Sequence, residues 1–301
     1  MTYIGKLGKL QVSEKNLGYF LVIPALAVVA VMAFWPTLAA FWMSLHDISL
    51  IFRTNRFIGL ENFRTMAGDP GFRNALHNTV YFTAVSVALE ALLGLVMALV
   101  MNGAFRGRGA VRASVLVPWA IPTVVTSTMW KWIFNTDYGL LNFLLKRFHI
   151  VSTYLNWLGD GKLAMGCAIM ADVWKTTPFI ALILLAGLQT ISHDLYEAAM
   201  IDGANWWQRF TRIMLPLLLP IGLVAVLLRT LDAFRVFALI FVLTGGGPAD
   251  ATEVLSTYTY KVLFSTSNFG YGSALAVSMF ISVAIISLVF LNFIRLGSRS
   301  S

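Results

Sequence analysis

Charged side chains recur within stretches of this sequence that are otherwise apolar enough to cross a membrane. Arg229, Asp232 and Arg235 follow one another at intervals of three residues, so one face of a helix would carry a positive, a negative and a positive group. Each charge costs at least about 2.5–3.5 kcal/mol at the centre of a bilayer unless it is paired or hydrated. Two interpretations stay open: the groups line a water-filled cavity for a polar solute, or they are ion pairs that position helices and touch no solute.

A second set of polar residues lies in the apolar run at 163–188. Asp172 and Lys175 stand three residues apart, which predicts an ion pair between them. Glu90 has no partner nearby in the sequence, so it needs a cation from another helix, and Arg229 and Lys175 are the obvious candidates. Pro178 frees the carbonyl about four residues before it for solvent or a ligand. The residues that we expect along a solute pathway are Trp174, Lys175, Thr176, Thr177, Phe179, Asp232, Phe234 and Arg235, and those that we expect to pair within the membrane are Glu90, Asp172 and Arg229.

The polar segment at 189–216 separates two long apolar runs. A short helix can begin near Ser192, with Glu197 in its first turns, where the helix dipole favours an acid. Gly203 permits a turn before a second short helix, and Pro216 then resets the chain before the next apolar run. We predict a compact helix-turn-helix knob at the membrane surface, with a shape suited to a groove of another protein.

This segment resembles the EAA signature of the membrane subunits of binding-protein-dependent ABC importers. The pattern EAA-x3-G-x9-I-x-LP is complete from Glu197 to Pro216. A plain membrane-surface connector is the alternative, and a match at every signature position and spacing counts against it. The residues that the resemblance assigns to contact with an ATPase subunit are Glu197, Ala198, Ala199, Asp202, Gly203, Ile213, Leu215 and Pro216.

Other stretches resemble the sugar-importing branch of these permeases, the maltose and trehalose type. They are VWKTTPF at 173–179, RTLDAFRVF at 229–237, LTGGGP at 243–248 and FGYGSAL at 269–275. The resemblance implies three kinds of partner: a second homologous permease, two cytosolic ATPase subunits and an extracytoplasmic sugar-binding protein. ATP and Mg would be bound by the partner ATPase, so no cofactor is expected in this chain. A disaccharide such as trehalose or maltose is the first expectation for the solute, with glycerol phosphate as the alternative.

Composition places the whole chain in the membrane. Of its 301 residues 58% are hydrophobic and 12% charged, about half the charged share of a soluble domain. We predict an all-α integral membrane protein with six transmembrane helices, and the resemblance implies a type I ABC importer permease core. The predicted spans are 19–45, 78–102, 111–134, 163–188, 217–243 and 272–296. The predicted divisions are a cytoplasmic tail at 1–18, a first helix and outer loop at 19–71, a transmembrane core at 72–296 that includes the coupling loop at 189–216, and a cytoplasmic tail at 297–301.

The net charge of +8 is spread over tails and loops without a basic stripe, so no nucleic-acid partner is expected. Basic residues before the first span, between spans two and three and after the last span predict that both termini and the 189–216 loop are cytoplasmic. The outer loop at 46–77 also carries arginines, so the charge rule is not obeyed cleanly. The expected location is the inner or plasma membrane of a bacterium or archaeon.

Two other classes of function are alternatives. An ion-coupled secondary transporter would use Glu90 and Asp232 as proton or sodium carriers, but no inverted repeat is visible. A membrane enzyme is disfavoured because no metal-ligating cluster, nucleophile motif or catalytic dyad occurs, so neither a metal nor a catalytic site is expected. The glycine-rich stretch at 244–248 lacks the lysine and hydroxyl residue of a phosphate loop, so the chain is expected to have no ATPase site of its own.

Overall fold

The computed structural model describes residues 14–297. Residues 1–13 and 298–301 of the predicted tails lie outside this range, whereas 14–18 begin α1 and 297 ends α14. The α-helices are α1 (Glu14–Val29), α2 (Trp35–Ser44), α3 (Glu61–Gly68), α4 (Pro70–Asn102), α5 (Arg108–Ala120), α6 (Thr123–Ile133), α7 (Leu140–Arg147), α8 (Gly161–Gln189), α9 (His193–Ile201), α10 (Trp206–Arg209), α11 (Leu215–Ala233), α12 (Ala238–Leu243), α13 (Leu255–Tyr260) and α14 (Phe269–Gly297). Three π-helical turns, η1 (Ala30–Phe34), η2 (Phe210–Met214) and η3 (Lys261–Ser265), and one hairpin of strands β1 (His46–Ser49) and β2 (Thr54–Phe57) complete the described elements.

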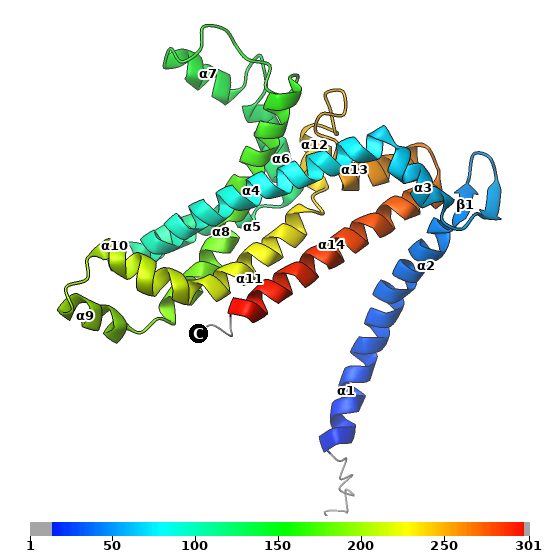
Figure 1. Cartoon of the computed structure of the whole chain (residues 1–301). Helices are drawn as coiled ribbons and strands as arrows, with labels where there is room; N and C mark the ends of the chain where they lie inside the picture. Colours follow the sequence, from blue (N-terminus) through cyan, green and yellow to red (C-terminus); the bar gives the residue numbers. More distant parts are fainter. Residues whose placement is uncertain (1–13, 298–301) are drawn as a thin grey trace, which may run out of the picture.

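The helices include those needed for a multi-pass membrane protein. Among the described residues, five helices are long and apolar enough to cross a membrane, and the number is six if the bent pair α5–α6 counts as one span. Figure 1 shows α9 and α10 at one end of the molecule, whereas β1, α3 and α13 gather at the other end and α7 stands on a separate arm. The short polar helices of the predicted coupling loop therefore lie at the opposite end from the outer loops.

The core forms where α4 packs along α8, with α11 against both. Gly94 on α4 permits this close approach, because a Cβ there would lie 2.8 Å from the Ile180 side chain on α8. Small and aliphatic side chains fill the contact, among them Ala98, Ala181 and Leu184. The spans that carry the intramembrane charges, α4, α8 and α11, thus pack against one another.

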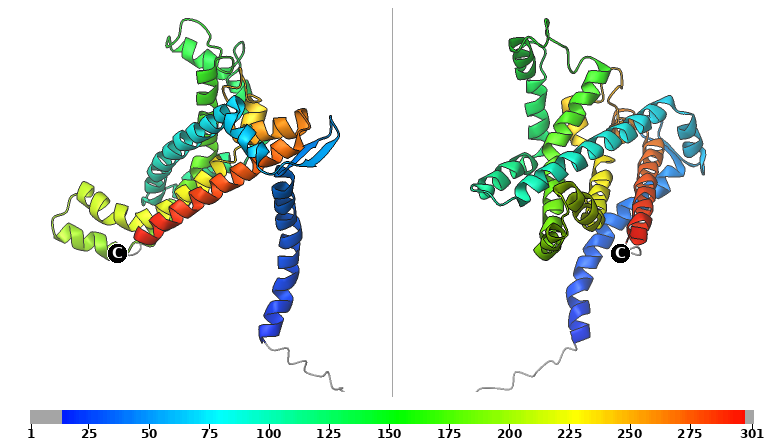
Figure 2. Two further views of the ribbon diagram at one scale, coloured as in Figure 1. Left: turned by 45° about the vertical axis from the view of Figure 1, so that its right-hand side comes forward. Right: turned by 60° about the vertical axis from the view of Figure 1, so that its left-hand side comes forward.

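The first span stands apart from this core. Its α2 part packs against α14, whereas α1 extends away from the other helices, as the two views of Figure 2 show. No residue in the most apolar window of this span is buried. The π turn η1 lies just before Pro36. It is closed by the Trp35 N–H, which donates to the Ala30 carbonyl five residues earlier. This wider turn lets the helix continue past a proline that would otherwise break it.

Two of the predicted continuous spans are broken, and those predictions were wrong. The span predicted at 111–134 is α5 and α6, which meet at 93°. Pro122 follows the extended residue Ile121 at this corner, and a residue before proline disfavours helix. The span predicted at 217–243 ends as α11 at Ala233, and the chain turns before α12 packs against α6. Apolar composition does not mark this second break, because both sides are equally apolar.

Candidate functional site: a buried charge cluster, a polar cavity and an exposed helical knob

Arg229 on α11 is the centre of a buried charge cluster. Its guanidinium donates to Glu90 on α4 through Nε at 2.5 Å and Nη2 at 3.1 Å. The same guanidinium bonds to Asp172 on α8, and its Nη1 lies 3.3 Å from Asp232 Oδ2 one turn along α11. Glu90 has no exposed surface and Arg229 only 3%. One planar cation therefore joins three carboxylates from the three helices of the core, with the fork geometry that a guanidinium provides.

This cluster settles the pairing predictions in different ways. Of the two candidate partners for Glu90, Arg229 is confirmed, and the Arg229–Asp232 pair is confirmed as well. The predicted Asp172–Lys175 pair is wrong, because Asp172 turns to Arg229. The third charge of the predicted series on α11, Arg235, does not pair with Asp232. It donates to the Leu231 carbonyl at 3.0 Å. The contacts of Asp172 and Lys175 follow the packing of the helices and not the spacing along one helix.

A polar cavity of about 410 Å³ opens beside the cluster. It lies where the α5–α6 corner, α8, the end of α11 and α12 meet. Its lining residues are Trp119, Thr123, Asp172, Lys175, Thr176, Arg229, Asp232, Arg235, Val236, Phe237, Ala238 and Leu239. The structure thus brings together four of the predicted pathway residues, Lys175, Thr176, Asp232 and Arg235. Trp119, Thr123 and Phe237 were not among the predicted pathway residues. The signal for the first two was the proline beside them, and Phe237 ends the stretch at 229–237 that resembles the sugar-importing branch.

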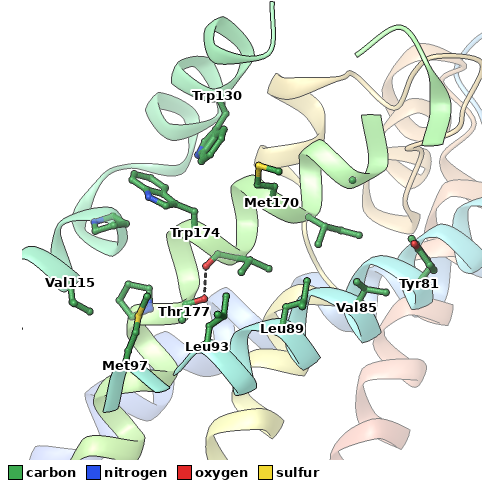
Figure 3. A pocket seen from close by; sticks show the side chains of 15 residues that line it. Tyr81, Val85, Leu89, Leu93, Met97, Val115, Trp130, Met170, Trp174 and Thr177 are labelled. Carbon is green, nitrogen blue, oxygen red and sulfur yellow. Dashed lines mark hydrogen bonds between the residues drawn. The ribbon is translucent and has the colours of Figure 1, made fainter. Parts of the chain in front are cut away.

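The remaining predicted pathway residues lie elsewhere. Trp174 and Thr177 line a separate cavity of about 620 Å³. Its walls are almost entirely apolar, and Figure 3 shows Trp130 from α6 and Trp174 from α8 projecting toward the same space beside Leu89 and Leu93 of α4. The reason is helical geometry, because consecutive residues of α8 point to different faces. The two cavities share no lining residue.

Two aromatic residues of the predicted set lie behind the polar cavity or away from it. Phe179 stacks on Trp119, with ring centroids 6.1 Å apart, so it supports a cavity-lining residue from behind. Phe234 is 4% exposed and packs with Ala75 and Leu255. Contact of Phe234 with a solute would need a different arrangement of these helices.

The first half of the 189–216 segment ends in a Schellman motif. The Ser192 side chain caps α9 by accepting from the Asp194 N–H at 3.2 Å. At the other end the Ala204 N–H bonds to the Ala199 carbonyl and the Gly203 N–H to the Met200 carbonyl, at 2.8 and 3.1 Å. Gly203 adopts φ +80°, the left-handed conformation that this motif requires. The spacing between the second alanine and the glycine of the signature is therefore the spacing of a helix C-cap, as the predicted turn requires.

The second half differs from the prediction in one respect. The Asn205 and Gln208 side chains form a capping box for α10, but Pro216 does not interrupt the chain. The π turn η2 precedes it, so that one helical path runs from Trp206 to Ala233. The prediction that Pro216 resets the chain was wrong, because a π turn removes the clash that proline makes in a regular helix. Ile213 and Leu215 lie on this same path.

The knob, residues 193–214, exposes several large apolar side chains. Ile201 is 87% exposed, and Trp206 and Trp207 are 60% and 61% exposed. The Trp206, Trp207 and Phe210 rings stack at centroid distances of 5.4–6.1 Å, which gives this surface a rigid aromatic patch. Asp194 occupies the first turn of α9, whereas Glu197 lies one turn later and is exposed. Glu197 forms no side-chain hydrogen bond or ion pair among the described residues.

The fold and these sites define a multi-pass helical membrane protein with a polar cavity among its spans and an exposed helical knob at one end. A family model described as "Binding-protein-dependent transport system inner membrane component" matches residues 90–299. The chain belongs to this family of transport permeases, as the EAA resemblance indicated. The signature segment and the charge cluster both lie within the matched residues.

Relatives support the same assignment, and a solved structure shares the fold. The chain is 44% identical over 284 residues to the trehalose/maltose transport system permease protein MalF of Thermococcus litoralis, covering 94% of this chain and 95% of that one. It is 40% identical over 283 residues to the trehalose transport system permease protein SugA of Mycobacterium tuberculosis, covering 94% and 90% of the two chains. In fold it is similar to a chain of a bacterial ABC transporter that imports the acidic polysaccharide alginate, with a TM-score of 0.82, 22% identity and coverage of 96% and 97%.

Proposed function

We propose that this chain is a permease subunit of an ATP-driven carbohydrate importer and forms half of the translocation pathway for a disaccharide of the trehalose or maltose kind. The observation that carries the proposal is the polar cavity among the spans of a binding-protein-dependent permease. Its volume of about 410 Å³ lies within the usual range of small-molecule sites, about 300–1,000 Å³. The relatives named for trehalose or maltose support the class of solute.

The chemistry of the cavity wall suits a sugar. Asp232 and Arg235 offer an acceptor and donors at an exposed position, and Thr176 offers a hydroxyl. Sugar hydroxyls donate and accept hydrogen bonds, so a wall with both kinds of group matches them. Trp119 and Phe237 add aromatic faces on which a pyranose ring can stack. Arg229, by contrast, is nearly buried by its three carboxylates and acts in our proposal as the structural centre of the wall.

We further propose that the knob at 193–214 docks on a cytosolic ATPase subunit, which binds the ATP and Mg. Its exposed apolar surface is of the kind that marks a protein contact. A homologous permease would supply the other half of the pathway, the second ATPase would dock there, and an extracytoplasmic binding protein would deliver the sugar. The family description supports a binding protein, and the knob lies at the end opposite the outer loops. Both termini would then be cytoplasmic, in the inner or plasma membrane.

Uptake into proteoliposomes tests the proposal. The assembled transporter, with its binding protein, should accumulate labelled trehalose or maltose when ATP is enclosed with the ATPase and should fail to do so with an ion gradient alone. The isolated chain should hydrolyse no ATP. Uptake driven by a proton or sodium gradient without ATP would favour a secondary transporter, although the Glu90 carboxylate is held by Arg229 and is a poor candidate for a mobile carrier. Uptake of glycerol phosphate but of neither disaccharide would overturn the assignment of the solute.

A further inference from the structure

The corner between α5 and α6 leaves a backbone carbonyl without a helical partner. Ile121 ends α5 in an extended conformation, with φ −75° and ψ 133°, and Pro122 follows it without an N–H. This carbonyl lies at the negative end of the α5 dipole, where a cation is favoured. The Lys175 ammonium from α8 donates to it at 2.6 Å.

Lys175 makes this contact although carboxylates lie on the same wall of the cavity. It is only 9% exposed and forms no ion pair within 4.0 Å among the described residues. Three carboxylates surround the single guanidinium of Arg229, so a second cation on this wall is electrostatically favoured. The carboxylates of the cluster therefore favour a positive charge at Lys175, while the Lys175 ammonium donates its hydrogen bond to the Ile121 carbonyl at the corner.

The corner carries part of the cavity wall. Trp119 lies just before it and Thr123 just after it, and both line the polar cavity. Movement of the α5–α6 corner would displace both side chains together. The contact of Lys175 with Ile121 thus connects the charge cluster of the core with the shape of the cavity.

We propose that Lys175 is a positioning residue: it fixes the α5–α6 corner, and with it the wall formed by Trp119 and Thr123, through its hydrogen bond to the Ile121 carbonyl. The proposal deepens the proposed function, on which it rests for the identity of the cavity as the solute route. It differs from a direct role of Lys175 in binding the solute, because the ammonium is already engaged by backbone.

Thr126 provides a reporter for the corner. This residue lies one turn into α6, has no exposed surface, and its hydroxyl makes no hydrogen bond. Thr126→Cys in a Cys167→Ala background therefore introduces a single thiol that reacts with a water-soluble maleimide only when the corner opens. Lys131→Met is the matched control. Lys131 lies at the far end of α6 and also donates to a backbone carbonyl, that of Val242 on α12 at 3.5 Å, but it is exposed and does not line the polar cavity.

The full-length chain in membrane vesicles is labelled over time without any sugar. Lys175→Met should accelerate labelling of the Thr126→Cys thiol about tenfold or more, the ratio that the hydrogen bond of a charged donor to a buried acceptor supports. Lys175→Arg should restore the slow rate, and Lys131→Met should leave it unchanged. An unchanged rate in Lys175→Met, or equal acceleration by Lys131→Met, would overturn the proposal.

A second measurement separates positioning from general loosening. Chains that keep Cys167, which is buried on α8 and 3% exposed, should label equally slowly with Lys175 and with Lys175→Met. Acceleration there as large as at Thr126→Cys would show that the variant unfolds the bundle and would overturn the positioning role. Because labelling needs no transport, failure of trehalose and maltose uptake in the parent transporter would count against the proposed solute alone.

Discussion

Replacement of Arg229 by methionine is expected to destabilise the protein more than replacement of any of its three carboxylate partners. The methionine leaves Glu90 and Asp172 buried without a cation, and an uncompensated buried charge costs about 3–5 kcal/mol. For a chain of this size about 2 °C of melting temperature corresponds to 1 kcal/mol, so the expected loss is about 6–10 °C. The cost arises because one guanidinium serves all three carboxylates.

The carboxylate variants should follow their burial. Glu90→Gln keeps an acceptor for the guanidinium and leaves two carboxylates on it, so a loss of about 1.5–3 kcal/mol, or about 3–6 °C, is expected. Asp232→Asn should cost about 1 kcal/mol or less, because the Asp232 side chain is 70% exposed. Loss of Asp232 does not leave the buried cation unpaired. The structure gives Arg229 two further partners.

Thermal unfolding of the detergent-solubilised full chain, followed by fluorescence-detected size exclusion, measures these differences. Arg235→Met is the matched control, since Arg235 is exposed and its guanidinium contacts only a backbone carbonyl among the described residues. The Arg229→Met, Glu90→Gln double variant should lose less than the sum of the single losses, by about 2 kcal/mol. Additive losses, or an Arg229→Met variant no less stable than Arg235→Met, would refute the account of a shared buried cation.

Three further outcomes are expected. Gly203→Val should weaken co-purification of the ATPase more than Gly203→Asn, because asparagine tolerates φ +80° and a β-branched residue does not. Equal co-purification with the two variants would contradict a role for this turn. Gly94→Ala should lower the melting temperature, because the added Cβ would lie 2.8 Å from the Ile180 side chain. Gly166→Ala has open space around the added Cβ and should raise the melting temperature by about 2 °C through helix propensity. A change of the same sign in both variants would argue against this packing. Burial raises the pKa of the Asp69 carboxyl, but hydrogen bonds from Tyr258, Tyr271 and the Gly71 N–H hold this pKa below its ordinary 3.8. The parent protein should therefore be more stable than Asp69→Asn at neutral pH and lose this advantage only as the pH falls below 3.8. Loss of the advantage between about pH 7 and 5 would contradict this account.

The sequence was sufficient for the class of the protein and for its local turns. Apolar length alone predicts six crossings, because a helix must satisfy its own backbone within the bilayer. The signature at 197–216 likewise encodes a C-cap, since Ala199 and Gly203 stand at the separation that the Schellman motif needs. Such features depend on residues a few positions apart, which a sequence displays directly.

The tertiary structure decided which charges meet and which faces the pathway residues occupy. Asp172 has two possible cations in the sequence, and only the packing of α8 against α11 selects Arg229 over Lys175. Trp174 and Lys175 are neighbours in sequence, yet they face different cavities because α8 turns about 100° per residue. The break after Ala233, beyond which α12 packs against α6, is likewise not recorded by the apolar run. Pairing and orientation are contacts between distant segments, so they exist only once the helices have assembled.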